Sequence, residues 1–390
     1  MRILYHHRTQ ATDAQGVHIA EMISAFRHLG HEVCELALVR SSDAAGALPG
    51  QPRRSLWSAA VRRLPAPGDI PQLAFNLVGL PRLLWRALSF RASFMYERYS
   101  LYNFCGVIAG VLLRLPVILE VNSPLAIEES REKAIRWSRI ARASERWICN
   151  RATRVLVVSG PLREILEQEG VAPEKIVVMP NGVNPSRFAP ARTEADKLES
   201  LRRSTGLGDR ILIGFVGWFR PWHGLDLLLR AFVDGGLKDQ GAALLLVGDG
   251  PATPQIRALI EEHSLHDCVR ITGPIPHEQV PDYLRLVDVA VQPSANEYCC
   301  PVKIIEYMAL GKPIVAPRQA NIVELLTDGE DSLLFTPREA GSLAQALQRL
   351  VAEPGLRRRI GSAAAGVVES RGLTWAHNAS AVLRLVHGII

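Results

Sequence analysis

The segment Ile211–Gly217 reads Ile-Leu-Ile-Gly-Phe-Val-Gly, a short β-rich run that begins a second series of alternating strand and helix patterns. Further β-rich runs follow at Ala243–Val247, Val269–Thr272, Val289–Gln292 and Ile314–Ala316. Such alternation predicts βαβ units and a mainly parallel sheet. No G-x-G-x-x-G follows the first strand of the series, which disfavours a dehydrogenase.

The residues before this segment repeat the same pattern. Ile3–Tyr5 predicts a first strand, and Gly16 opens a helix that Gly30 ends. His31–Val39 predicts the second strand. Later strands are expected at Phe94–Glu97, Val117–Val121, Val155–Val158 and Ile176–Met179. We therefore expect an α/β protein of two Rossmann-like domains, at residues 1–182 and 209–372, joined by a linker at 183–208 and followed by a C-terminal helix at 373–390.

The composition is that of a folded globular chain. The 390 residues are 48% hydrophobic and 22% charged, and the formal net charge of +6 favours anionic partners. Six cysteines without a C-x-x-C pair predict reduced thiols. The N-terminus shows no signal-peptide pattern, and Leu101–Leu119, interrupted by Arg114 and Pro116, is too short to span a membrane. We expect a cytoplasmic protein.

The stretch Pro293–Pro313 contains the most informative candidate site. A strand ends before it, a loop carries Glu297, and Pro301 is expected at the first position of a helix. The N-terminus of a helix binds diphosphate well, and Lys303 is unfavourable there unless an anion is bound. Glu306, one turn further on, could bind ribose hydroxyls. The alternative is an ordinary surface helix with two unrelated carboxylates.

The second half of this stretch, Glu306–Pro313, reads Glu-Tyr-Met-Ala-Leu-Gly-Lys-Pro and resembles the donor-binding signature of retaining family-four glycosyltransferases, which have the GT-B fold. The first half departs from the pattern: Glu297 and Glu306 lie nine positions apart, one more than usual, and Cys299-Cys300-Pro301 replaces a Gly-rich turn. Either the loop has an extra residue or Tyr298 takes the usual glutamate position.

Other segments extend the resemblance to the donor. Val216–Gly224 is similar to a family loop whose basic residues hold the diphosphate, and Leu246–Gly250 to a turn that lets the nucleotide approach the backbone. Ile271–Pro276 is similar to the segment that meets the base. The resemblance thus implies donor-binding roles for residues of these three loops, namely Gly217, Arg220, His223, Gly248, Gly250 and Ile275. It implies the same role for residues around the predicted helix start, namely Cys300, Pro301, Val302, Lys303 and Glu306.

In the first half, Gly16 with His18 matches the loop on the acceptor side, and Gly16 is also counted among the donor-binding residues. Asn122 follows a predicted strand, where such folds direct residues toward ligand. The alternative is that Asn122 caps the next helix. His6 and His7 also end a strand, but without a third partner they do not predict a metal site.

The resemblance implies transfer of a sugar from a nucleotide-diphosphate donor to a glycan or lipid-linked acceptor, with retention at the anomeric carbon. The implied catalytic residues are Glu297, Arg220, Lys303 and Asn122, and His223 could also help to stabilise the departing diphosphate. We expect no metal or other cofactor and a role in cell-surface polysaccharide or glycoconjugate synthesis. The alternatives are a nucleotide-sugar epimerase, a phosphorylase, or a non-catalytic member that binds a membrane or a partner.

The segment Gln51–Arg91 interleaves arginines with Trp and Leu residues, a pattern that suits an anionic membrane surface. Ordinary amphipathic helices with solvated arginines show the same pattern, and that alternative stays open. We expect a possible peripheral position on the inner face of the cell membrane and no nucleic-acid partner.

Overall fold

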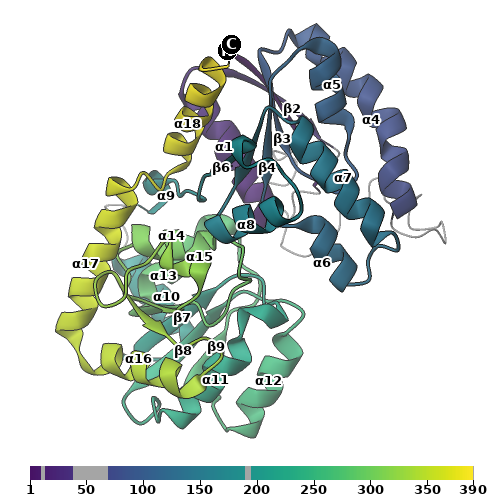
Figure 1. The fold of residues 1–390 in the computed structure, drawn as a ribbon. Coiled ribbons are helices and arrows are strands. Elements are labelled where there is room, and N and C mark those ends of the chain that lie inside the picture. The colour runs from purple at the N-terminus through teal and green to yellow at the C-terminus, as the bar shows by residue number, and fades with distance from the viewer. Residues whose placement is uncertain (10–13, 38–68, 189–194, 390) are drawn as a thin grey trace. The chain divides into compact units, whose positions relative to one another are not determined.

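The computed structural model describes residues 1–9, 14–37, 69–188 and 195–389. The chain forms two compact units (Figure 1). The first comprises the described residues up to Pro180 together with those from Trp375 onward, and the second comprises those of Asn181–Thr374. Each is a separate α/β body, as the alternating pattern predicts.

The first unit contains a parallel six-stranded sheet with the order β2-β1-β3-β4-β5-β6. Its strands are β1 (Arg2–His7), β2 (Glu32–Ala37), β3 (Phe94–Arg98), β4 (Val117–Val121), β5 (Arg154–Val157) and β6 (Ile176–Val178). Its helices are α1 (Ala14–His28), α4 (Asp69–Phe90), α5 (Cys105–Leu113), α6 (Leu125–Arg131), α7 (Ser138–Arg151), α8 (Gly160–Gln168) and α18 (Trp375–His387), with the short 3-10 helix η1 (Pro173–Lys175). The chain order reverses between β1 and β3.

The second unit repeats this plan with the strand order β12-β11-β10-β7-β8-β9, again parallel. Its strands are β7 (Ile211–Val216), β8 (Ala242–Val247), β9 (Val269–Ile271), β10 (Val289–Val291), β11 (Ile314–Pro317) and β12 (Ser332–Phe335). Its helices are α9 (Pro185–Phe188), α10 (Ala195–Thr205), α11 (Leu225–Asp234), α12 (Thr253–Glu262), α13 (Val280–Leu286), α14 (Val302–Ala309), α15 (Ala320–Val323), α16 (Ala340–Ala352) and α17 (Pro354–Ser370), with η2 (Pro221–His223) and η3 (His277–Gln279). Here the chain order reverses between β7 and β10.

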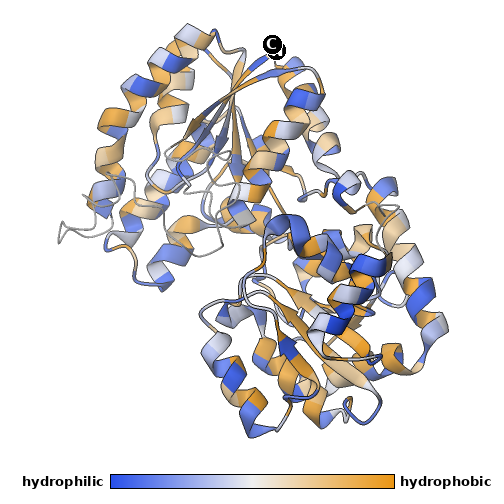
Figure 2. Ribbon diagram, turned by 180° about the vertical axis from the view of Figure 1, so that it is seen from behind, coloured by the Kyte–Doolittle hydropathy of each residue, from blue (hydrophilic) through white to orange (hydrophobic). Residues whose placement is uncertain are grey.

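Both sheets are buried under helices, so their strands are nearly continuous apolar runs (Figure 2). In the first unit, α1 and α18 contribute to the same core as the sheet, through side chains such as Phe26, Trp375 and Val382. The last helix of the chain therefore completes the core of the first unit.

Several expected boundaries differ from the structure. The helix expected from Gly16 already begins at Ala14, and the second strand is limited to Glu32–Ala37, while residues 38 and 39 lie outside the described part. β12 was not predicted. The expected linker at 183–208 contains α9 and α10, which belong to the second unit.

Within the described ranges, none of the helices combines the length and the apolar character that crossing a membrane requires. The hydrophobic stretch at 101–119 divides into α5 and β4.

Candidate functional site

In a parallel α/β sheet such as that of the second unit, ligands usually bind at the carboxyl ends of the two strands where the chain order reverses. These strands are β7 and β10, which pair directly. The loop after β7 carries Gly217, Arg220 and His223, and the loop after β10 carries Glu297 and leads into α14. Most of the sequence-predicted donor residues therefore lie in the second unit, at or near the carboxyl ends of its strands, whereas Gly16 belongs to the first unit.

The N-terminus of α14 lacks a side-chain cap. Its N-cap is Pro301, one position earlier in the helix than expected, and neither a capping hydrogen bond nor an acidic residue is present in the first turn. The first backbone N–H groups of the helix therefore have no capping side chain, and they carry the positive end of the helix dipole. Val302 and Lys303 stand at this end, so an anion is the natural partner.

Lys303 is directed at the loop after β7. Its Nζ lies 4.2 Å from the centre of the Phe215 ring and 3.4 Å from His223 Nε2. A Cβ atom added to Gly217 would lie 3.1 Å from the same Nζ. Burial lowers the pKa of Lys303 to about 8, partly offset by the nearby Glu306 carboxylate. A bound anion would favour the charged form of this lysine.

His223 does not supply a positive charge to this loop. Burial and the adjacent Lys303 lower its pKa to about 2, so the imidazole is neutral at ordinary pH. A ring nitrogen of His223 instead accepts a hydrogen bond from the backbone N–H of Arg220, over 3.4 Å, which shapes the short helix η2.

Arg220 is an exposed cation in the loop after β7. Its guanidinium lies 5.2 Å from the centre of the Trp222 ring, a cation–π contact that orients the side chain without using its N–H donors. Because Arg remains charged at any ordinary pH, Arg220 contributes a permanent positive charge beside α14.

The structure explains why glycines occupy the turn after β8. A Cβ on Gly248 would lie 2.1 Å from the carbonyl oxygen of Gly217, and one on Gly250 would lie 2.5 Å from the backbone nitrogen of Phe219. The loops after β7 and β8 therefore pack backbone against backbone. Gly248 also pairs with Gly273, which places the loop of the half-buried Ile275 beside this turn.

Glu297 stands apart from the cationic cluster. It is exposed, and among the described residues no hydrogen bond or ion pair joins its carboxylate to another side chain. Glu306, by contrast, is buried one turn into α14 and acts electrostatically on Lys303. The structure thus brings Glu306 to Lys303 and leaves Glu297 free to meet a ligand.

The loop that carries Glu297 is shaped by amide side chains that the sequence patterns did not identify. Asn321 Nδ2 donates to the carbonyl oxygens of Asn296, at 2.9 Å, and Cys299, at 2.7 Å. Gln319 Nε2 donates to the carbonyl of Ala295 at 3.2 Å. A pair of amides at the start of α15 is the only signal in the sequence for this role.

Cys300 is a structural residue of the same loop. Its carbonyl accepts a hydrogen bond from Asn181 Nδ2 at 2.7 Å, and its sulfur accepts one from the Asn181 N–H at 3.3 Å. Burial raises the pKa of the thiol to about 12, so Cys300 stays protonated. Any contact with donor would use its backbone.

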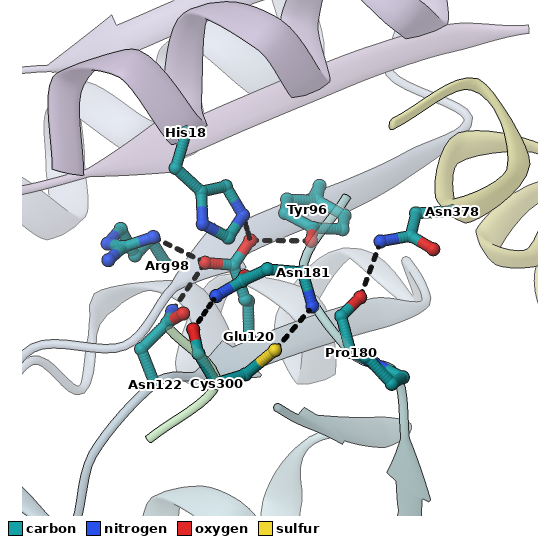
Figure 3. A network of polar contacts seen from close by, with 9 residues as sticks. All are labelled: His18, Tyr96, Arg98, Glu120, Asn122, Pro180, Asn181, Cys300 and Asn378. Atoms are coloured by element: carbon teal, nitrogen blue, oxygen red, sulfur yellow. Dashed lines mark hydrogen bonds and ion pairs between the residues drawn. The ribbon is translucent and has the colours of Figure 1, made fainter. Parts of the chain in front are cut away.

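In the first unit, Asn122 belongs to a network centred on Glu120 at the end of β4 (Figure 3). Its Nδ2 donates to Glu120 Oε1 at 2.5 Å. The N-cap of the following helix α6 is Pro124, with no side-chain cap. The alternative in which Asn122 caps that helix is therefore wrong. Gly16 is buried on α1, two positions before His18, which also contacts Glu120.

The histidines at the end of β1 are paired with carboxylates. His6 Nδ1 lies 2.7 Å from Glu97 Oε1, and His7 Nε2 lies 3.0 Å from Glu35 Oε1. In the described part of the chain, no group of three or more His, Cys, Asp or Glu side chains is arranged to hold a metal ion.

Two parallel sheets, each with one reversal of the chain order, define a protein of two Rossmann-like units. Residues 14–182 match the family model of the glycosyl transferase 4-like domain, and residues 210–353 match that of glycosyl transferases group 1. The chain is a glycosyltransferase with the GT-B fold.

Characterised relatives are similar over much of their length. Alpha-D-kanosaminyltransferase of Streptomyces kanamyceticus is 27% identical over 77% of this chain and 81% of its own. A D-inositol 3-phosphate glycosyltransferase of Streptomyces scabiei is 30% identical over 74% of this chain and 66% of its own. Anabaena HepE, solved in complex with UDP, superimposes with a TM-score of 0.78 at 17% identity and full coverage of both chains. Sucrose-phosphate synthase of Thermosynechococcus elongatus gives a TM-score of 0.72 at 20% identity, covering 99% and 98%.

Proposed function

We propose that this glycosyltransferase moves a sugar from a nucleotide-diphosphate donor to a hydroxyl group of a glycan or lipid-linked acceptor, with retention at the anomeric carbon. The observation that carries the proposal is the uncapped N-terminus of α14 with Lys303 and Arg220 beside it. A diphosphate satisfies the free N–H groups and both cations. HepE, which shares the fold, has been solved with UDP and with UDP-glucose, and this supports a uridine donor.

Catalysis in this proposal is mainly electrostatic. As the bond from the anomeric carbon to phosphate breaks, negative charge grows on the leaving diphosphate, where Arg220, Lys303 and the α14 N–H groups stabilise it. Neutral His223 can donate a hydrogen bond. Because these groups neutralise the phosphates, we expect transfer without an added divalent metal.

Glu297 and Glu306 would bind different parts of the donor. Glu297, exposed on its loop, would orient hydroxyls of the transferred sugar, and buried Glu306 would hold the ribose. In retention without a protein nucleophile, the acceptor hydroxyl attacks from the face that the diphosphate leaves, through an oxocarbenium-like state. Precise orientation of the sugar is then what the protein contributes. Resemblance of Glu306–Pro313 to the retaining enzymes supports this part of the proposal.

The test begins with the melting temperature of the protein in UDP, GDP, ADP and dTDP sugars, because a ligand that binds the native state raises it. We expect a UDP sugar to give the largest rise and to be consumed only with an acceptor hydroxyl present. Consumption without acceptor would indicate an epimerase, and dependence on inorganic phosphate would indicate a phosphorylase. No rise with any nucleotide sugar would contradict the proposal.

A membrane-proximal acceptor is supported by the exposed face of α4. Leu77, Pro81, Trp85 and Leu88 follow helical spacing, and Leu77 and Trp85 are 81% and 66% exposed. Arg82 beside them is exposed as well, whereas Arg86 is partly buried and donates to Cys34 Sγ. An apolar face flanked by a cation suits an anionic lipid surface and fits synthesis of cell-surface glycans. The part of the predicted basic region at 51–68 lies outside the described residues.

We expect the protein to sediment with vesicles containing an anionic phospholipid and the double variant Trp85→Ser, Leu88→Ser to remain in the supernatant. Burial of each large side chain in lipid contributes about 2 kcal/mol, so the paired change should weaken binding more than tenfold. Ile140→Ser, exposed on α7, is the matched control. Equal sedimentation of all three proteins would count against this face.

A further inference from the structure

The carboxylate of Glu120 is the centre of a buried network at the end of β4. Four side chains donate to it or pair with it, from β3, α1 and the residue just after β4, and all four point at it in Figure 3. The contacts are Arg98 Nη1 at 2.5 Å and Asn122 Nδ2 at 2.5 Å to Oε1, and Tyr96 OH at 2.6 Å and His18 Nε2 at 3.2 Å to Oε2. Each carboxylate oxygen thus has two partners.

This network keeps Glu120 ionised. Burial alone would raise the pKa of its carboxyl group, but His18 and Arg98 nearby, with the hydrogen bonds from His18 and Tyr96, hold the pKa well below its usual range. A carboxylate with two partners on each oxygen has little capacity left for a substrate. Glu120 is therefore placed to orient its neighbours rather than to touch the reacting atoms.

The orientation of Asn122 follows from this charge. An ionised carboxylate only accepts hydrogen bonds, so the NH₂ group of Asn122 must face Glu120 and its Oδ1 must face the other way. Asn122 is half-buried and follows the carboxyl end of β4, the edge of the sheet where ligands bind in such folds. Its oxygen is thus held as a hydrogen-bond acceptor at that edge.

His18 is fixed by the same carboxylate. Its ring lies 4.5 Å from the ring of Trp375, the first residue of α18, and contacts Glu120 through Nε2. One carboxylate therefore positions side chains from three parts of the first unit: His18 on α1, Arg98 on β3 and Asn122 in the loop after β4.

We propose that Glu120 is a positioning residue for acceptor recognition, which presents Asn122 Oδ1 to a hydroxyl group of the acceptor. The inference rests on the proposed sugar transfer and names the chemistry of one subsite. A hydroxyl donates to Oδ1, whereas a carboxylate or phosphate group of the acceptor would meet an oxygen that cannot donate to it. The subsite therefore selects acceptors with a neutral hydroxyl at this position.

The test is a double-mutant cycle with Glu120→Gln, Asn122→Ala and the variant that carries both changes. The amide of Glu120→Gln can turn its own NH₂ toward Asn122 and so removes the fixed orientation. We expect each single change to lower kcat/KM for the acceptor by about tenfold or more. The double change should lower kcat/KM no further than Asn122→Ala alone, because the effects of substitutions at residues that act through one contact are not additive. Additive losses would overturn the proposal.

Two further measurements separate positioning from general damage. The dissociation constant for the nucleotide sugar should be unchanged in all three variants, because the cations of the proposed donor site, Arg220 and Lys303, belong to the second unit. Glu145→Gln is the matched control: Glu145 is another buried carboxylate of the first unit, its Oε2 accepts from the Ala126 N–H at 3.1 Å, and its loss should leave the acceptor KM unchanged. A similar rise in acceptor KM for Glu145→Gln would overturn the assignment.

The variant Asn122→Asp, which leaves Glu120 unchanged, tests the proposal even if Glu120→Gln does not fold. This change keeps the shape of Asn122 but sets a second carboxylate against Glu120, so we expect it to lose as much acceptor kcat/KM as Asn122→Ala while nucleotide-sugar binding persists. Wild-type acceptor kinetics in Asn122→Asp would overturn the inference. Absence of transfer in the wild-type protein itself, with every nucleotide sugar, would instead overturn the proposed function on which it rests.

Discussion

Lys303 should give the proposed donor site a measurable pH dependence. Burial against Phe215 and neutral His223 lowers its pKa to about 8 in the free protein, and a bound diphosphate favours the charged form and raises that pKa. The affinity for a nucleotide sugar should therefore be constant below pH 8 and fall as the pH rises through about 8, by at most tenfold per unit. Calorimetric titration with UDP-glucose between pH 6.5 and 9.5 measures this.

The variant Lys303→Met is the control for that titration. The Met side chain keeps an apolar contact with Phe215 but carries no charge. The variant should therefore bind UDP-glucose more weakly than the wild type, with an affinity that does not change across the same pH range. An equal fall in the affinity of wild type and variant would place the titrating group elsewhere.

Sequence patterns can predict a single residue of the candidate site when its role depends on positions close to it in the sequence. A helix start with a lysine in its first turn is visible within a few positions, so the start of α14 was predicted to within one residue and Lys303 was placed in its first turn. The neutral state of His223 could not be predicted, because it depends on burial and on Lys303, far away in the sequence. Asn321 was missed because its hydrogen bonds reach a loop more than twenty positions earlier.

The turn after β8 allows a test of loop packing at the scale of elements. Gly248 has φ 131° and no room for a Cβ beside Gly217, whereas Gly273 has φ 74° with open space around it. Gly248→Ala should therefore lower the free energy of unfolding by roughly 3 kcal/mol or more, and Gly273→Ala by about 1 kcal/mol. Urea unfolding of the two variants measures the difference, and equal losses would contradict the packing of the two loops.

Most strands could be predicted, because parallel strands buried on both faces are short apolar runs bounded by turn residues. β12 was not predicted because Ser332–Phe335 begins with a polar residue and follows the acidic turn Asp328–Asp331. The order of the strands could not be read from the chain. The Glu120 network depends on that order, because Tyr96 and Arg98 reach Glu120 only when β3 pairs with β4.

For the whole molecule, the proposed function gives the two units different tasks. The first is completed by α18, whose Trp375 and Val382 are buried in its core, so both ends of the chain build it. This unit carries the Glu120 network, whereas the second carries every cation of the proposed donor site. The division predicts that donor binding and acceptor selection can be altered separately by substitution.

The central claim is that the second unit binds the donor diphosphate through Arg220 and the N-terminus of α14. The most direct measurement is the dissociation constant of UDP, by calorimetry, for the wild type and for Arg220→Ala. Loss of a charged hydrogen-bond donor to phosphate should weaken binding by about tenfold or more. Arg230→Ala, which removes only an exposed pair with Asp226, should bind UDP as the wild type does. Equal affinity of Arg220→Ala and the wild type would contradict the claim.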